Sequence, residues 1–285
     1  MTQIKSRCIL ITGGASGIGK LLASECLKKK AYKVILWDIN EQLLEETKTE
    51  FAHKGWDIDT HVVDIASLDD IKAAAALVKE RHTTVDILFN NAGIVVGKPF
   101  EQHTHRDIQK TIGINVSGVM HTALEFLPDM LDQCDGHIVN LASAAGLISN
   151  PNMSVYAASK WAVIGWSDSL RLEMENNDTG VHVTTVMPSY IDTGMFDGVK
   201  PPMFTPLLKP QYIVDKIIEA VENNEIILQE PMMVKSVPVL KGILPRRMFD
   251  FVAGKMFGVH TSMEQFKGRP SEIAVPDKEN LKSKK

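Results

Sequence analysis

Short apolar runs alternate with longer amphipathic stretches along the first three quarters of the chain. The runs around Ile9, Val34, Ile87 and Ile138 are apolar without alternation, which is typical of strands covered on both faces. We predict strands at Arg7–Thr12, Lys33–Asp38, Asp57–Val63, Asp86–Asn90, Gly136–Ala142 and His182–Met187. The stretches between them predict helices at Gly17–Lys30, Glu41–Ala52, Asp69–Arg81, Thr104–Leu131 and Ser154–Asn176. A helix at Gln211–Glu222 then leads to a last strand at Glu225–Leu228.

Strands and helices that alternate at this spacing imply right-handed crossovers and a parallel sheet. The expected fold class is therefore α/β, with a single doubly wound, Rossmann-like parallel sheet flanked by helices. We assign residues 1–230 to this catalytic domain and 231–285 to a C-terminal helical extension with a polar tail, which we expect to fray over Pro270–Lys285. Glycines and prolines break up Pro188–Pro210, and a long loop at such a strand end lies over the ligand crevice.

The composition of the 285 residues, 44% hydrophobic and 23% charged, is that of a globular protein. A net charge of −4 gives no reason to expect a nucleic-acid partner. Three scattered cysteines favour a reducing compartment, and no cluster of histidines, cysteines and carboxylates has the spacing of a metal site. We find no leader segment and no apolar run near the roughly 20 residues that span a bilayer, so we expect a soluble, cytoplasmic protein.

A glycine-rich loop follows the first predicted strand and opens the first predicted helix. Its glycines allow the backbone to approach a pyrophosphate, while the helix amino terminus offers free N–H groups and positive potential. Such a loop is also found as a tight turn that binds nothing, and only its context favours a nucleotide site. The residues expected at the cofactor are Gly13, Ser16, Gly17, Ile18 and Gly19.

Asp38 ends the second predicted strand, about 20 residues after the loop, where a carboxylate accepts hydrogen bonds from a ribose. The same carboxylate repels a 2′-phosphate, and no neighbouring cation offsets it, so we predict NAD rather than NADP as the cofactor. Asp64 and Ile65 follow the third strand and are expected at the adenine edge. The turn after the fourth strand could simply start a helix, or it could support the cofactor. We favour the second interpretation, in which Asn91, Ala92 and Gly93 support the cofactor.

Tyr156 and Lys160 lie one turn apart at the start of a long predicted helix, so their side chains share a face. Lowering the pKa of a tyrosine by about 3 units requires about 4 kcal/mol, which an ammonium at about 4 Å supplies at an effective dielectric of 20. Lys160 could thus make Tyr156 an acid/base at neutral pH. An exposed tyrosine–lysine pair of no function is the alternative for this motif alone.

Two further polar residues are expected near this pair. Ser143 ends the fifth strand, where its hydroxyl could donate to a substrate oxygen, although serines also cap helices and turns there. Asn115 lies within an apolar helix, and either bends that helix through an internal bond or joins Lys160 through water.

Together these features resemble the short-chain dehydrogenase/reductase family from Cys8 to about Met195. The motifs are TGGASGIG, the strand-end Asp38, NNAG, Asn115, Ser143, YAASK, and Pro188 leading to Thr193. The resemblance implies that Tyr156 is the acid/base, that Ser143 orients the substrate, and that Lys160 also holds the nicotinamide ribose. It further implies a relay through Asn115 and contacts of Ile191 and Thr193 with the nicotinamide carboxamide. It also implies a homodimer or homotetramer, paired through Thr104–Leu131 and Ser154–Asn176.

The sequence LWDIN around Asp38 and the C-terminal segment Leu244–Phe266 resemble one branch of this family, that of the retinol and 17β-hydroxysteroid dehydrogenases and their bacterial relatives. The animal members of this branch usually carry an amino-terminal membrane anchor, which we do not find in this sequence. We therefore expect NAD-dependent interconversion of an apolar secondary or allylic alcohol, such as a retinoid-, steroid- or lipid-like one, and its ketone or aldehyde. A 3-oxoacyl thioester reductase and an NAD-sensing scaffold without turnover are the alternatives.

The stretch 231–269 mixes apolar and basic residues, which fits either a helix in a membrane interface or a flap or subunit contact. We favour the flap or contact over the membrane surface.

Overall fold

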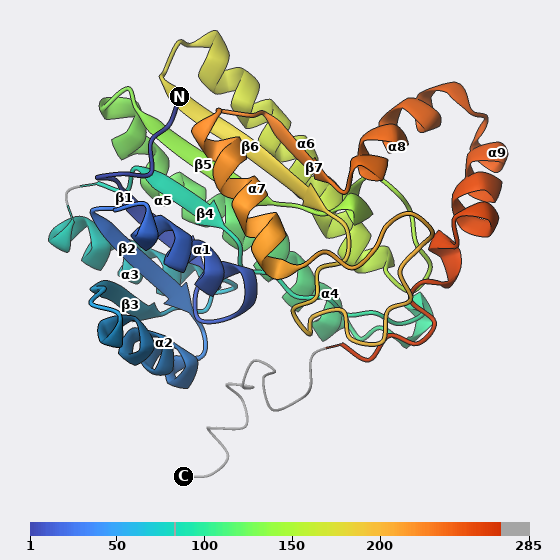
Figure 1. Cartoon of the computed structure of the whole chain (residues 1–285), viewed down its shortest axis with the longest axis horizontal. Helices are drawn as coiled ribbons and strands as arrows, with labels where there is room; N and C mark the ends of the chain where they lie inside the picture. The colour runs from blue at the N-terminus through green and yellow to red at the C-terminus, as the bar shows by residue number, and fades with distance from the viewer. Residues whose placement is uncertain (83, 269–285) are drawn as a thin grey trace.

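The computed structural model describes residues 1–82 and 84–268 and contains a seven-stranded parallel sheet (Figure 1). The strand order β3-β2-β1-β4-β5-β6-β7 reverses direction between β1 and β4. Ligands bind at such a reversal, outside the carboxyl ends of the strands. The strands are β1 Cys8–Thr12, β2 Lys33–Asp38, β3 Ile58–Val62, β4 Ile87–Asn90, β5 Gly136–Leu141, β6 Val181–Pro188 and β7 Ile227–Glu230. The predicted fold class is confirmed.

Helices cover both faces of the sheet, because alternate strand residues point into two separate apolar layers. Ile9 and Ile11 face the layer formed with α1, α2 and α7, whereas Cys8 and Leu10 face the layer formed with α3, α5 and α6. This double burial explains the unbroken apolar runs of the strands. The helices are α1 Gly17–Lys28, α2 Glu41–His53, α3 Leu68–Arg81, α4 His105–Ile112, α5 Val119–Asp132, α6 Ser154–Asn176 and α7 Pro210–Glu222.

Most elements lie within one or two residues of their prediction, and two differences have a clear physical cause. The helix expected over Thr104–Leu131 is divided into α4 and α5 by a π-helical segment, Gly113–Gly118, which contains Asn115. A Cβ on Gly118 would lie 2.2 Å from the Ile65 side chain, so this glycine lets the widened turn approach the loop after β3. The last strand begins at Ile227, two residues later than predicted, because the Glu225 N–H still bonds Ala220 at the end of α7.

A helical extension follows β7 and projects beyond the carboxyl ends of the strands (Figure 1). It consists of α8 Met232–Ile243, α9 Arg246–Phe251, a π-helical turn Val252–Met256 and a 3-10 turn Val259–Thr261. None of the helices within 1–82 and 84–268 is both long and apolar enough to cross a bilayer. The polar tail predicted at Pro270–Lys285 lies outside the described residues.

Candidate active site

The glycine loop between β1 and α1 forms the floor of a crevice at the carboxyl ends of the strands. Gly13 and Gly17 have φ angles of 64° and 53°, which favour glycine. A Cβ on Gly19 would lie 2.1 Å from the Gly13 carbonyl oxygen, so only glycine allows the loop to fold back on the helix. Ser16 precedes α1 without a side-chain capping bond, and the first-turn N–H groups of α1 are available to an anion.

Asp38 is held in a fixed orientation at the end of β2. Its two carboxylate oxygens accept hydrogen bonds from the backbone N–H of Ala15 at 3.1 Å and of Asn40 at 3.0 Å. Asp38 also lines the crevice beside the glycine loop, at the distance along the chain where a ribose is expected.

In the turn after β4, Asn91 hydrogen-bonds to the glycine loop and Gly93 leaves space beside Lys160 and Asn115. The Asn91 amide donates to the carbonyl oxygens of Thr12 and Gly13, at 2.9 and 3.0 Å, and so ties this turn to the glycine loop. A Cβ on Gly93 would lie 3.7 Å from the Lys160 ammonium nitrogen and 3.4 Å from the Asn115 amide oxygen. A larger side chain at Gly93 would therefore crowd the polar end of the crevice.

Most of the predicted cofactor-binding and catalytic residues line the crevice. Those that line it are Gly13, Ser16, Gly17, Ile18, Asp38, Asp64, Ile65, Asn91, Ala92, Gly93, Ser143, Tyr156, Lys160, Pro188, Ile191 and Thr193. Gly19 and Asn115 do not line it. Gly19 shapes the loop from below, and Asn115 acts on its neighbours from within the π-helical turn.

Burial dominates the electrostatics of Tyr156, which is 5% exposed. Burial raises the pKa of Tyr156, and the neighbouring Ser143 hydroxyl opposes this rise. The Lys160 ammonium lies 5.8 Å from the Tyr156 ring centroid and donates to the Leu141 carbonyl oxygen at 2.6 Å. Ser143 therefore favours the phenolate, against the effect of burial.

Asn115 is connected to the catalytic helix through Ser159. Its amide nitrogen donates to the Ile94 carbonyl at 2.9 Å and to the Ser159 hydroxyl at 3.1 Å, and its amide oxygen accepts from the Ile94 N–H. Ser159 in turn donates to the Tyr156 carbonyl oxygen at 2.7 Å. The side chain thus satisfies its own bonding capacity and fixes the turn around Ile94 against α6.

The buried ammonium of Lys160 makes stability depend on pH. Burial lowers the pKa of Lys160 from 10.5 to about 8. Between these two values the unfolded chain binds more protons than the folded chain, so the Lys160 contribution to stability rises with pH. We expect the unfolding free energy of the wild type, relative to Lys160→Met, to increase by a few kcal/mol from pH 7.5 to 10. Urea unfolding at several pH values measures this, and a difference that is flat or falls with pH would contradict it.

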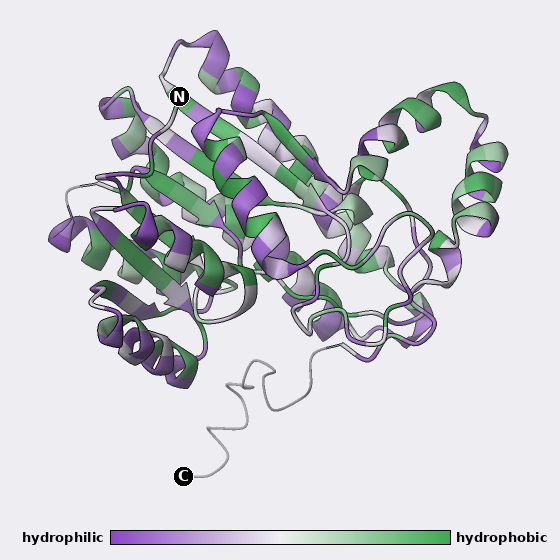
Figure 2. Cartoon of the chain, viewed as in Figure 1, coloured by the Kyte–Doolittle hydropathy of each residue, from purple (hydrophilic) through white to green (hydrophobic). Residues whose placement is uncertain are grey.

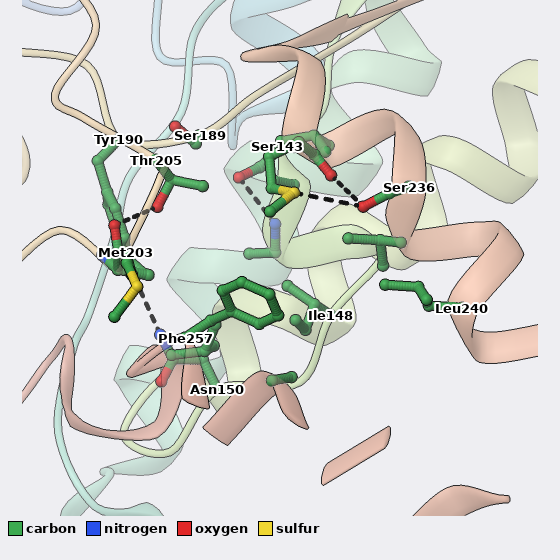
Figure 3. Close-up of a pocket in the computed structure, with 18 of the residues that line it drawn as sticks. Ser143, Ile148, Asn150, Ser189, Tyr190, Met203, Thr205, Ser236, Leu240 and Phe257 are labelled. Atoms are coloured by element: carbon green, nitrogen blue, oxygen red, sulfur yellow. Dashed lines mark hydrogen bonds between the residues drawn. The ribbon is translucent and has the colours of Figure 1, made fainter. Parts of the chain in front are cut away.

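A second, apolar cavity adjoins the crevice and shares Ser143, Ser189 and Phe196 with it. Figure 3 shows Ser143 and Ser189 among the residues around this cavity. Its far wall is formed by the C-terminal extension, including Met233, Val234, Val237, Leu240, Phe249, Val252, Ala253, Phe257 and Val259. α8 and α9 therefore cover a cavity that opens beside Ser143, as a flap would.

The contacts that hold this cover in place could not be predicted from the sequence. The Lys241 ammonium donates to the Leu147 carbonyl and lies 4.3 Å from the Trp161 ring centroid, which anchors α8 on α6. Asn150 donates to the Tyr190 hydroxyl at 2.9 Å and to the Ser262 hydroxyl at 2.8 Å. These partners lie far apart in the sequence, and no local pattern indicates that they meet.

The C-terminal segment also closes the site directly above the tyrosine. Met263 is buried against Tyr156, and a Cβ on Gly97 would lie 2.5 Å from Phe266. Backbone bonds from Lys200 to Ser262 and from Lys267 to Asp197 join this segment to the loop after β6. The loop after β6 and the C-terminal segment are therefore joined into one cover beside Tyr156.

The sequence is similar to known proteins over most of its length. The sequence pattern of the family described as short chain dehydrogenase matches residues 7–203. Human short-chain dehydrogenase/reductase 3 is 35% identical over 264 residues, which cover 92% of this chain and 86% of the relative. Mouse epidermal retinol dehydrogenase 2 is 33% identical over 271 residues, covering 94% and 87%. Estradiol 17-beta-dehydrogenase 11 of Pongo abelii is 35% identical over 257 residues, covering 89% and 84%.

Solved structures share the fold. A short chain dehydrogenase/reductase from Burkholderia phymatum in complex with NAD has a TM-score of 0.77 and 26% identity, covering 85% of this chain and 95% of its own. A short chain dehydrogenase from Burkholderia cenocepacia in complex with NADP has a TM-score of 0.74 and 24% identity, covering 88% and 98%. This chain belongs to the short-chain dehydrogenase family, whose members are oxidoreductases of CH–OH groups that use a nicotinamide cofactor.

Proposed function

We propose that this chain is an NAD-dependent dehydrogenase that interconverts an apolar secondary or allylic alcohol and its carbonyl compound. The observation that carries the proposal is the pair of adjoining spaces, one lined by glycines and Asp38 and the other almost wholly apolar. Ser143 lies where the two meet. The relatives named for retinol and estradiol support an apolar substrate, because those names denote large, sparingly polar alcohols.

The residues of the crevice fit a dinucleotide. The glycine loop can turn tightly beneath a pyrophosphate, because Gly13 and Gly19 have no side chain to clash with Asn91, Ala92 and the loop's own backbone. Asp38 would accept hydrogen bonds from the adenosine ribose and repel a 2′-phosphate, which supports NAD over NADP. Ile191 and Thr193 line the opposite end of the crevice, where the nicotinamide would lie. When bound, the nicotinamide supplies the hydride acceptor, or the donor in the reverse direction.

The protein's own part in the reaction is to position the alcohol and to move its hydroxyl proton. Ser143 would hold the substrate oxygen, and Tyr156 would take the proton at its phenol oxygen during alcohol oxidation and return it during carbonyl reduction. Burial raises the pKa of Tyr156, so an additional positive charge is needed to make it a base. Lys160 and the oxidised nicotinamide ring would provide that charge, while Ser159 and Asn115 would hold the helix in place.

A panel of substrates tests this proposal. Nicotinamide absorbance is followed with NAD and apolar alcohols of increasing size, and with NADH and the matching ketones, a 3-oxoacyl thioester being included. The proposal expects turnover that becomes more efficient as the apolar part grows. Turnover of the thioester alone would favour a 3-oxoacyl thioester reductase, and tight NADH binding without any turnover would favour a scaffold.

The apolar cavity should set the largest substrate. Ala253 is 6% exposed and lines the cavity, so Ala253→Leu adds three carbon atoms to its wall. We expect kcat/KM to fall about tenfold for the longest alcohols, since two excluded methylenes cost about 1.6 kcal/mol. Short alcohols should change less than about twofold by the same reasoning. Ala52→Leu, at an exposed position of α2, is the matched control, and an equal loss for short and long alcohols would contradict the assignment.

A further inference from the structure

The outer side of the C-terminal extension is apolar and faces solvent. We define the outer face as the exposed apolar side chains of α8, α9 and the turn that follows, whose exposed fractions lie between 54% and 79%. They are Met232, Val239, Ile243, Met248, Phe251 and Met256. Figure 2 shows hydrophobic residues along α8 and α9, which stand clear of the main body of the molecule. Large apolar side chains gathered in this way on a protein surface mark a site of interaction.

The inner side of the same helices is also apolar, because it covers the cavity. In α8, Met233, Val237 and Leu240 line the cavity, while Val239 and Ile243 point outward. A helix that is apolar on both sides requires an apolar environment on both sides. The cavity provides one of these environments, and the outer face needs the other.

Cations border the outer face. Lys235, Arg246, Arg247 and Lys255 are exposed, and Asp250 is the single acidic residue between Met232 and Phe257. The chain as a whole carries a charge of −4, so this region has the opposite sign to the rest. The core of an ordinary subunit contact is depleted of lysine, whereas Lys235 and Lys255 border the outer face. A two-fold contact between copies through the outer face would place these cations near their own equivalents.

We propose that the outer face binds the surface of a bilayer containing anionic phospholipids. The apolar side chains would enter the boundary between headgroups and acyl chains, and the four exposed cations would meet the phosphate and carboxylate groups of the lipids. Only the thickness of α8 and α9 would then separate the lipid from the cavity beside Ser143. An apolar alcohol dissolved in the bilayer would thus have a short path to the site, which goes beyond the proposed chemistry.

Flotation with vesicles tests the proposal on the full chain. Vesicles of phosphatidylcholine mixed with phosphatidylserine should carry the protein up a density gradient at low salt, and added salt should release it. Vesicles of phosphatidylcholine alone should carry much less. The readout is binding and not turnover, so it stands or falls separately from the proposed dehydrogenase activity.

Two double variants locate the contact. Ile243→Glu with Met248→Glu, and Arg246→Glu with Arg247→Glu, should each lower the ratio of vesicle-bound to free protein at least about tenfold. The matched controls are Tyr32→Glu with Leu77→Glu, at exposed apolar positions of the main body, and Lys48→Glu with Lys72→Glu, which change the charge by the same amount. The controls should float like the wild type, and circular dichroism checks that every variant is folded.

Three results would overturn the proposal. The full chain could stay at the bottom of the gradient at low salt with anionic vesicles. The Lys48/Lys72 control could lose as much binding as the Arg246/Arg247 variant, which would indicate a general effect of charge. The Ile243/Met248 variant could split an oligomer without any change in flotation, which would make the outer face a contact between copies of the chain.

Discussion

Replacement of Tyr156 with phenylalanine will lower kcat about 10²–10⁴-fold and leave the dissociation constant for NADH within a few-fold of the wild type. The variant loses only the phenol oxygen, while the ring keeps its place between Met153 and Met263 and its edge contact with Phe196, 6.3 Å away between centroids. Initial rates with saturating alcohol and NADH fluorescence titration measure the two quantities.

Tyr212→Phe is the matched control for this substitution. Tyr212 is 42% exposed on α7 and does not line the crevice, and its hydroxyl donates to Glu230, so the variant should keep its activity. If Tyr156→Phe keeps more than about a tenth of the wild-type kcat, general acid–base catalysis by Tyr156 is wrong.

The second large effect concerns the choice of cofactor. The double variant Asp38→Ser with Ile39→Arg should change the ratio of kcat/KM for NADP to that for NAD by at least about a hundredfold in favour of NADP. The substitution removes the repulsion of a 2′-phosphate and adds a charged hydrogen-bond partner, and such bonds contribute about 1.5–3 kcal/mol each. Kinetics with both cofactors at a fixed alcohol concentration give the ratio.

Ile39→Arg alone keeps the carboxylate and should shift the ratio much less than the double variant. Because Asp38 also accepts bonds from Ala15 and Asn40, the loss of NAD activity must be compared with the unfolding free energy of each variant. A wild-type enzyme that already prefers NADP would refute the assignment of Asp38.

The sheet and the glycine loop could be predicted because their signals are local. Each strand buries both faces, which gives a continuous apolar run, and the loop requires glycine at positions 13, 17 and 19 for steric reasons visible in the motif. The turn at Gly113–Gly118 could not be predicted in the same way. Its widening depends on how closely Gly118 meets Ile65, a contact between segments that are far apart in the sequence.

The same distinction between local signals and long-range contacts applies to the candidate site. Its backbone-defined residues could be predicted from their positions at strand ends. The burial that raises the pKa of Tyr156 could not, because it depends on Met153, Met263 and Phe196 meeting the tyrosine ring. The cover over the cavity depends on Lys241 meeting Trp161 and on Asn150 meeting Ser262. Periodicity shows that α8 is apolar, but it does not show which side meets the cavity.

Transfer of isotope tests the central claim most directly. An apolar secondary alcohol that carries deuterium on its carbinol carbon is incubated with the wild-type chain and NAD, and the recovered NADH is analysed by mass spectrometry. We predict one deuterium per NADH formed, and transfer at least about a hundredfold slower with Tyr156→Phe under the same conditions. NADH without deuterium, or equal transfer by the variant, would contradict it.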